Sequence, residues 1–259
     1  MIRVVLMGAA GRMGRAVEAA AAGSGDLMIG ARVDLRGNIP GDGSGWATDL
    51  AAVLKPGDVV VDFSGPAGAR LAAQSCAAAK AGLVTGSTGL SADDEAALQA
   101  AAVHVPVLRA SNFSLGVAAL RVALRAALAA VPGSWDIEIV ERHHRLKKDS
   151  PSGTAVTLAN DVRAARSLPV SAVRHGREGL VGPRPAGELG MHAVRGGTWV
   201  GDHTVLLAGE GEWLELRHVA QDRAAFAHGA LAAVRFVATA VPGGYTLEDV
   251  LGGPGPLRH

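Results

Sequence analysis

Cysteine is almost absent from the sequence, since Cys76 is the only one among 259 residues. A single thiol excludes an intramolecular disulfide and any zinc site that is built from several thiolates. The composition fits a protein that is kept in a reducing compartment, and we expect a cytoplasmic location.

Aromatic residues and net charge are also scarce. The chain has four tryptophans, four phenylalanines and one tyrosine, too few for a surface on which nucleic-acid bases stack. Lysine and arginine number 25 against 24 aspartates and glutamates, so the net charge of +1 gives no overall field that attracts nucleic acid or an anionic membrane. We therefore expect neither nucleic acid nor a membrane as a partner.

Long apolar runs are absent too, although 49% of the residues are hydrophobic. Arg121 and Arg125 interrupt the longest candidate, so no stretch reaches the roughly 18 residues that a membrane-spanning helix needs. The apolar start at residues 1–8 is short for a signal peptide, and Arg12 and Arg15 follow it at once. The hydrophobic content is instead enough for a substantial core, in one large domain or two smaller ones.

A glycine-rich turn follows the first predicted strand, at residues 2–7, and three glycines at positions 8, 11 and 14 precede a helical pattern. Glycines permit a tight turn and let a pyrophosphate approach backbone amides at a helix N-terminus. Asp34 ends the second predicted strand, 20 residues after Gly14. A dinucleotide fold places the acid that binds the adenosine ribose at this point. Turn and acid together predict a dinucleotide site.

Strands alternate with helices through the rest of the first half. This alternation indicates a doubly wound parallel sheet, whose ligands lie at the C-terminal ends of the strands. The predicted strands are residues 27–33, 59–63, 83–85 and 105–108, and the predicted helices are residues 66–81 and, after a Ser91 cap, 96–102.

The most polar stretch of the chain is residues 141–154, which we place between a strand at 136–140 and a helix at 154–165. Its adjacent imidazoles, His143 and His144, suit proton transfer near neutral pH. The amides of the Gly-Thr pair that ends the stretch belong to a helix N-terminus, which attracts carboxylate or phosphate. A solvated basic loop would explain the cations but not the paired imidazoles. We therefore predict an acidic substrate that is protonated during reaction.

The pattern of the second half of the sequence predicts an α+β domain with a mostly antiparallel or mixed sheet. A helix at residues 115–131 leads into it, a glycine- and proline-rich loop covers residues 176–190, and a last helix at 224–239 packs on either domain. The remaining strands are predicted at residues 192–195, 204–208 and 213–219. Three histidines fall on these strands at no metal-ligand spacing, so we predict structural roles for them and no metal site; they are His192, His203 and His218.

The polar stretch resembles the signature of the dihydrodipicolinate (4-hydroxy-tetrahydrodipicolinate) reductase family. Further motifs stand in the order of that family, so the resemblance covers nearly the whole chain. They are residues 8–14, 61–63, 86–89, 112–114 and 201–204, with Arg223 and residues 226–229.

The resemblance implies a Rossmann-like dinucleotide-binding domain at residues 1–114 and 224–259, and a smaller α+β domain with a mixed sheet at 115–223 for substrate binding and tetramer formation. It implies a homotetramer that passes a hydride from NADH or NADPH to a small dicarboxylate substrate in lysine and diaminopimelate biosynthesis.

The resemblance also assigns roles to residues. It makes His143 the general acid and gives Lys147 a carboxylate-binding and proton-assisting role. The residues that it implies for substrate binding are His144, Gly153 and Thr154. Those that it implies for cofactor binding are Gly8, Ala9, Ala10, Gly11, Arg12, Met13, Asp34, Gly86, Ser87, Thr88, Ala110, Ser111, Asn112 and Phe113.

Asp34 also bears on the choice of cofactor. Members that bind the 2′-phosphate of NADPH often place an arginine directly after the ribose acid, whereas Leu35 stands here, and Gly65 stands where some relatives carry another arginine. The Asp34 carboxylate repels a phosphate, although Arg36 is near enough in sequence to offset it. We predict that NADH is used at least as well as NADPH.

Two alternatives stay open on the sequence alone. One is an NAD(P)-dependent oxidoreductase of the same two-domain plan that acts on a different small acid. The other is a non-catalytic protein whose basic loop binds nucleic acid or a phosphoprotein, against which the balanced charge and few aromatic residues argue.

Overall fold

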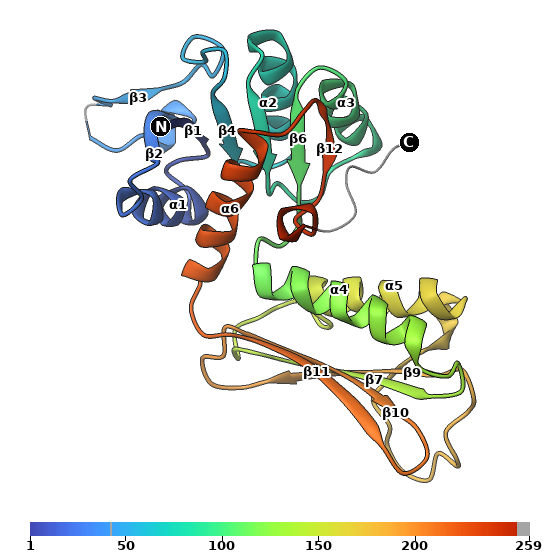
Figure 1. Ribbon diagram of the computed structural model, residues 1–259. Coiled ribbons are helices and arrows are strands. Elements are labelled where there is room, and N and C mark those ends of the chain that lie inside the picture. Colours follow the sequence, from blue (N-terminus) through green and yellow to red (C-terminus); the bar gives the residue numbers. More distant parts are fainter. Residues whose placement is uncertain (42, 253–259) are drawn as a thin grey trace. The chain divides into compact units, whose positions relative to one another are not determined.

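The computed structural model describes residues 1–41 and 43–252, and the chain divides into two compact units. Unit 1 comprises Met1–Leu115 together with the chain from Ala224 onward, and unit 2 comprises Gly116–Arg223 (Figure 1). Unit 2 is therefore one continuous insertion into the chain of unit 1.

Unit 1 contains a sheet of seven described strands in the order β12-β6-β5-β4-β1-β2-β3, and all neighbouring strands are parallel. The chain runs from β1 to β2 on one side and then returns to β4 on the other. This reversal of direction is where a doubly wound sheet binds ligands. The strands are β1 (Ile2–Met7), β2 (Leu27–Val33), β3 (Trp46–Ala47), β4 (Val59–Asp62), β5 (Gly82–Thr85), β6 (Pro106–Arg109) and β12 (Gly243–Tyr245).

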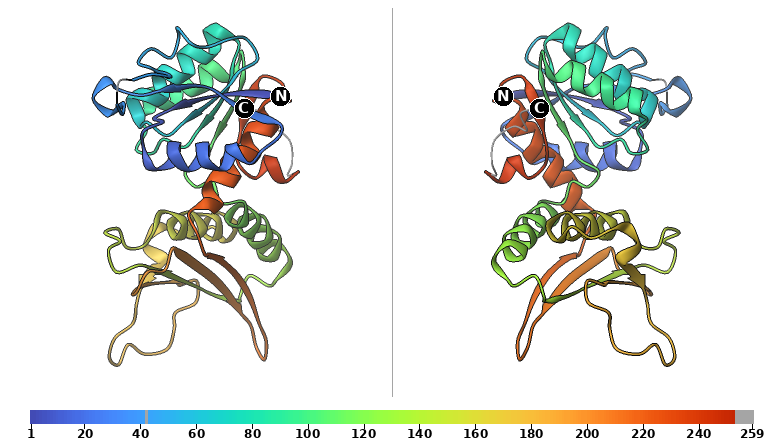
Figure 2. Two further views of the ribbon diagram at one scale, coloured as in Figure 1. Left: turned by 90° about the vertical axis from the view of Figure 1, so that its left-hand side faces the viewer. Right: turned by 90° about the vertical axis from the view of Figure 1, so that its right-hand side faces the viewer.

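Helices cover both faces of this sheet, α1 and α6 on one side and α2 and α3 on the other (Figure 2). Strands β4 and β5 are consequently buried over their whole length, which suits their apolar residues and leaves only the last residue of each, Asp62 and Thr85, polar. The last helix packs on unit 1, which the sequence left undecided, and the predicted doubly wound fold is confirmed. The helices are α1 (Arg12–Ala22), α2 (Pro66–Ala79), α3 (Ala92–Ala102) and α6 (Ala224–Val237).

Unit 2 contains a five-stranded sheet in the order β11-β10-β7-β9-β8. Strand β10 is antiparallel to both β7 and β11, whereas β7, β9 and β8 run parallel, so the sheet is mixed, as predicted. The strands are β7 (Asp136–His143), β8 (Val173–His175), β9 (Leu189–Arg195), β10 (Gly201–Ala208) and β11 (Trp213–Ala220).

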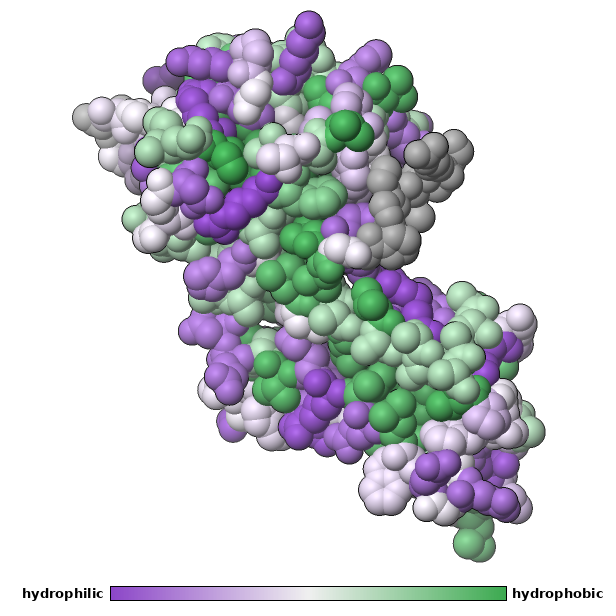
Figure 3. Space-filling model, in the orientation of Figure 1, coloured by the Kyte–Doolittle hydropathy of each residue, from purple (hydrophilic) through white to green (hydrophobic). Residues whose placement is uncertain are grey.

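Two helices, α4 (Leu115–Ala130) and α5 (Gly153–Arg166), lie over one face of the second sheet (Figures 1 and 2). Buried side chains such as Leu124, Leu158 and Ile139 fill the space between the two layers. Helix α4 is also tied to α5 by an ion pair, since the Arg121 guanidinium lies 2.7 Å from the carboxylate of Asp161. The solvent side of α4 is apolar (Figure 3), with exposed alanines and Val122.

Some predicted boundaries were wrong. Strand β7 continues through His143, so the first residues of the polar stretch belong to a strand rather than to a loop, and β9 begins at Leu189. Strands β3, β8 and β12 were not predicted, because two or three residues are too few to show a period of two. Within the described ranges, no helix is long and apolar enough to cross a membrane.

Candidate active site

The glycine turn follows β1 at the reversal point of the first sheet. Gly8 has a φ of +76°, and a Cβ atom there would lie 3.1 Å from the backbone of Phe63. A Cβ at Gly14 would lie 2.5 Å from the Gly8 carbonyl oxygen, so this glycine lets α1 pack directly on the turn. Helix α1 begins just after Gly11, its N-cap. The turn therefore has the backbone that a pyrophosphate needs for close approach.

Asp34 lies beside this turn, at the end of β2. One of its carboxylate oxygens accepts a 2.9 Å hydrogen bond from the Ala10 amide, and the other accepts a 2.8 Å bond from the Asn38 side chain. Of the two arginines near Asp34 in the sequence, one is paired with a carboxylate and the other is exposed. Arg32 pairs with Glu18, whereas Arg36 is exposed in a short 3₁₀ turn. The carboxylate is thus fixed next to the glycine turn.

A buried carboxylate that sequence reasoning missed, Asp62, joins the loops after β4 and β5. It has no exposed surface and accepts hydrogen bonds from Thr85 Oγ1 at 2.7 Å and Ser87 Oγ at 2.8 Å. Its other oxygen accepts a bond from the Ser64 amide at 2.9 Å, and Ser87 Oγ in turn accepts from the Gly65 amide at 2.9 Å. The sequence did hold one signal for Asp62, namely a carboxylate at the C-terminal end of an apolar strand, where a parallel sheet binds its ligands.

Aromatic rings complete this edge of unit 1. The rings of Phe63 and Phe113 meet edge to face with centroids 5.4 Å apart. A Cβ at Gly86 would lie 2.1 Å from the Phe63 ring, so only glycine fits there without a shift of that ring. The Ala110 amide donates to the Thr85 carbonyl at 3.1 Å. This bond holds the loop after β6 beside the loop after β5. The remaining predicted residues follow these strand ends; Thr88 and Ser111 are exposed, and the Asn112 side chain accepts a bond from Ser114.

In unit 2, His143 is buried near the end of β7, with 7% of its surface exposed. Its Nδ1 atom lies 2.6 Å from Oε2 of Glu141, which is two residues earlier and so projects from the same face of the sheet. Burial lowers the pKa of His143 below its ordinary value, although the hydrogen bond to Glu141 acts in the opposite direction.

Glu141 has no exposed surface and was not among the predicted site residues. Both of its oxygens accept from the Arg195 guanidinium, at 2.7 and 2.8 Å, and Oε1 also accepts from the Ser152 amide at 3.0 Å. Burial alone raises the pKa of this carboxyl. The bonds from Arg195, His143 and Ser152 outweigh that effect and hold the pKa below its ordinary value, so the carboxylate is charged.

Ser152 is the N-cap of α5, and its Oγ accepts a 3.2 Å bond from the Ala155 amide. Gly153 and Thr154 form the first turn of the helix, where backbone N–H groups point away from the helix body. A Cβ atom at Gly153 would meet open space. This end of α5 is a fitting site for a carboxylate group.

His203, for which we predicted a structural role, packs against His143. Its ring centroid is 5.1 Å from that of His143, and its Nε2 atom lies 3.0 Å from Ser152 Oγ. Burial, with a contribution from the neighbouring His143, lowers the pKa of His203 to about 4, so this imidazole is neutral at physiological pH. A Cβ at Gly201 would lie 3.2 Å from His143 Nε2. The register that pairs His203 with Glu141 places it here.

The loop between β7 and α5 carries the other predicted residues. The Lys147 ammonium lies 2.9 Å from the Asp149 carboxylate, and the His144 amide donates to the Trp199 carbonyl at 2.8 Å. Unit 2 therefore brings together, within one short segment, a buried imidazole, the lysine of the following loop and a helix N-terminus.

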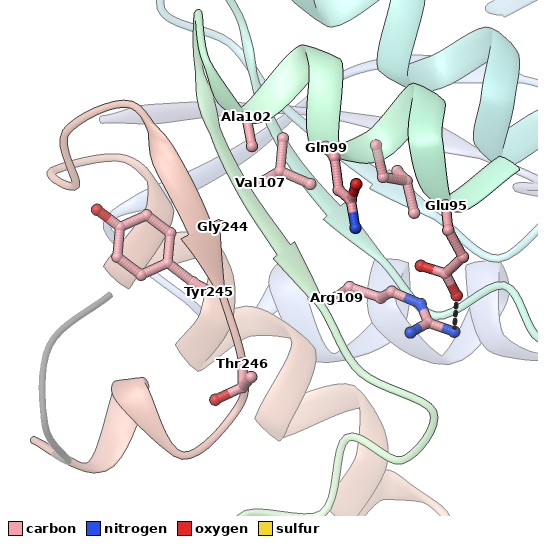
Figure 4. Close-up of a pocket in the computed structure, with 9 residues that line it drawn as sticks. Glu95, Gln99, Ala102, Val107, Arg109, Gly244, Tyr245 and Thr246 are labelled. Carbon is pink, nitrogen blue, oxygen red and sulfur yellow. Dashed lines mark ion pairs between the residues drawn. The ribbon is translucent and has the colours of Figure 1, made fainter. Parts of the chain in front are cut away.

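A pocket of about 570 Å³ lies elsewhere on unit 1, between α3, β6 and β12 (Figure 4). None of the predicted site residues lines it. Its charged lining residues, Glu95 and Arg109, neutralise each other at 2.6 Å, so we assign no chemistry to it. In the part of the chain that the structure describes, no three His, Cys, Asp or Glu side chains are grouped to hold a metal ion.

Comparison with known proteins gives matches along the whole chain. The family model "Dihydrodipicolinate reductase, N-terminus" matches residues 2–113, and "Dihydrodipicolinate reductase, C-terminus" matches residues 116–251. The 4-hydroxy-tetrahydrodipicolinate reductases of Caulobacter vibrioides and Thermomicrobium roseum are 41% and 43% identical to the chain. Each alignment covers 97% of this chain, and 97% and 100% of the respective relative.

Solved structures agree with these matches. The dipicolinate-bound dihydrodipicolinate reductase from Paenisporosarcina sp. TG-14 superimposes with a TM-score of 0.81 and 26% identity, over 96% of this chain and 99% of that one. The DAP dehydrogenase of C. glutamicum, at a TM-score of 0.57 and 16% identity over 98% of this chain and 96% of that one, shares the fold alone.

Proposed function

This chain belongs to the dihydrodipicolinate reductase family, and on that premise we propose which of its residues carry the reaction. Its function is the NADH- or NADPH-dependent reduction of 4-hydroxy-tetrahydrodipicolinate to tetrahydrodipicolinate, a step of lysine and diaminopimelate biosynthesis. The names of the relatives support this substrate rather than a different small acid. Overall, the substrate gains a hydride and a proton and loses water.

In our proposal His143 is the general acid. Bound NADH or NADPH supplies the hydride, and the negative charge left on the ring is then quenched by a proton from the imidazole. General-acid assistance of this kind is typically worth about 10²–10⁴-fold in rate. The observation that carries the proposal is the 2.6 Å contact between the buried His143 Nδ1 and Glu141, because a charged carboxylate stabilises the imidazolium form.

The substrate has two carboxylates and needs two anion sites. We assign one to Lys147 and the other to the first turn of α5, where Gly153 and Thr154 present backbone amides. Lys147 also assists protonation, and His144 contacts the substrate from the same loop.

We assign the cofactor to the C-terminal edge of the unit 1 sheet. The turn from Gly8 to Met13 holds the pyrophosphate and Asp34 the adenosine ribose, while two further segments, residues 86–88 and 110–113, hold the nicotinamide end. The close packing at Gly8, Gly14 and Gly86 supports this assignment, since larger residues there would occupy the path of the backbone or of a ring.

The test is a coupled assay in which dihydrodipicolinate synthase supplies the substrate and NADH absorbance is followed. Tetrahydrodipicolinate must form in proportion to the NADH oxidised. Oxidation of NADH without this product would contradict the function, and an unaltered rate in His143→Gln would contradict the assignment of the acid.

We further propose a homotetramer in the cytoplasm, with no nucleic-acid partner. The face of the second sheet opposite to α4 and α5 carries the exposed apolar residues Val194, Trp213 and Val219, as surfaces between subunits commonly do. Light scattering at micromolar concentration tests the assembly, and a monomer mass would contradict it.

A further inference from the structure

We propose that Glu141 is a positioning residue that holds the acid His143 and the anion-binding end of α5 in one fixed arrangement. This inference rests on the proposed function, because it assigns Glu141 an effect on the reaction that passes through His143.

The two oxygens of Glu141 are divided between the two halves of the site. Oε2 bonds His143 Nδ1 at 2.6 Å, and Oε1 accepts from the amide of Ser152, the N-cap of α5, at 3.0 Å. One rigid carboxylate thus spans the strand that carries the proton donor and the helix end that binds a carboxylate group. The distance between proton donor and bound substrate is set by this side chain.

Arg195 fixes the carboxylate in turn. It bonds both oxygens of Glu141 and also donates to the Asp149 carbonyl at 2.8 Å. Asp149 pairs with Lys147, so the same contacts extend to the loop that carries the second proposed substrate cation. The guanidinium keeps the buried Glu141 ionised, and a neutral carboxyl could not accept at all of these positions.

The contact to Nδ1 also selects the proton that is transferred. Because the charged carboxylate accepts a hydrogen bond from Nδ1, the hydrogen on Nδ1 is held by Glu141. The proton that passes to the substrate therefore comes from Nε2. Nε2 lies on the side of Gly201 and His203. The other charged groups that act on His143 are Lys147 and Arg195, both cations, which makes Glu141 the group that favours its protonated form.

The experiment compares Glu141→Gln with Glu138→Gln. Glu138 is a matched control on the same strand, since its carboxylate also accepts from two arginines and lies 2.6 Å from a histidine nitrogen, Nε2 of His192. It differs from Glu141 in projecting from the opposite face of the sheet. Folding of both variants is checked by circular dichroism and urea unfolding of the whole chain, because both substitutions lie in unit 2. The readouts are kcat and its dependence on pH.

We expect Glu141→Gln to lower kcat at least about tenfold and to move the alkaline limb of the kcat profile to lower pH by about one unit, while Glu138→Gln changes neither. Loss of folded protein would lower kcat without moving the limb. A limb at the wild-type position in Glu141→Gln would overturn the proposal.

A second variant keeps the proposal testable if Glu141→Gln does not fold. Glu141→Asp retains the charge but withdraws the carboxylate by one methylene, so we expect lower turnover with a nearly unmoved limb. Wild-type turnover in Glu141→Asp would overturn the positioning role. If instead His143→Gln retained full activity, the proposed function of His143 would fail, whatever the Glu141 variants show.

Discussion

The carboxylate of Asp34 accepts a 2.9 Å hydrogen bond from the backbone amide of Ala10, which ties the end of β2 to the glycine turn after β1. Asn38 and the Leu35 amide hold the other oxygen at 2.8 Å each. The negative charge is therefore fixed beside the glycine turn, where we propose that the adenosine ribose binds. Two ribose hydroxyls suit such a carboxylate, and a 2′-phosphate does not.

Cofactor preference follows from this arrangement. We expect NADH to be used at least as well as NADPH, and Asp34→Ala combined with Leu35→Arg to shift the ratio of kcat/KM values toward NADPH. Leu35→Ala is the control, because it adds no charge and should leave the ratio unchanged. A wild-type preference for NADPH above about tenfold, or about 1.4 kcal/mol, would mean that Arg36 neutralises the Asp34 charge.

Replacement of the acid should act on chemistry and not on cofactor binding. We expect His143→Gln to lower kcat by roughly 10²-fold or more, since glutamine cannot deliver the proton, while NADH affinity stays at the wild-type value. His192→Gln is the control, because His192 lies on the neighbouring strand and pairs with Glu138 on the other face of the sheet. Steady-state kinetics and NADH fluorescence titration measure both effects.

Lys147 and Lys148 are adjacent but differently placed, since the side chain of Lys147 is 20% exposed and paired with Asp149, whereas Lys148 is exposed. We expect Lys147→Ala to raise the KM for the dicarboxylate substrate about tenfold or more, because it removes a charge-assisted bond. Lys148→Ala should change KM little. Equal effects of the two substitutions would indicate general electrostatic attraction by the loop.

The pH dependence should differ between kcat/KM and kcat. Burial lowers the pKa of His143 in the free protein, and activity is lost as the pH rises through that pKa because the acid must be protonated. A bound dianionic substrate raises the pKa. We therefore expect the alkaline limb of kcat to lie at higher pH than that of kcat/KM. If the alkaline limbs of kcat and kcat/KM lay at the same pH, the charge of the bound substrate would not raise the pKa of His143.

His203 links pH to stability. Its pKa is about 4 in the folded protein against an ordinary value of 6.5, so the unfolded chain binds more protons between these values. The stabilisation is complete above pH 6.5 and is lost as the pH falls toward 4, by on the order of 3 kcal/mol. Urea unfolding across this range should show a steeper loss in the wild type than in His203→Gln. Equal slopes would contradict the role of His203.

The sequence by itself determined the doubly wound sheet, the glycine turn with Asp34, and the polar segment with His143. These features are encoded locally. Apolar strands followed by glycines, and a strand followed by a helix cap, each fall within a short stretch of chain, so propensity and spacing suffice to find them.

Tertiary structure decided which side chains surround His143. His143 is paired in register with Arg195 and Glu141 with His203, across residues more than fifty positions apart in the chain. A shift of one residue in either pairing would turn these side chains to the opposite face of the sheet. The order of the strands, which decides that β7 lies between β9 and β10, cannot be read from the sequence of any one strand. For this reason Glu141 was not among the predicted site residues and His203 was given only a structural role. The folded sheet identifies both as neighbours of His143.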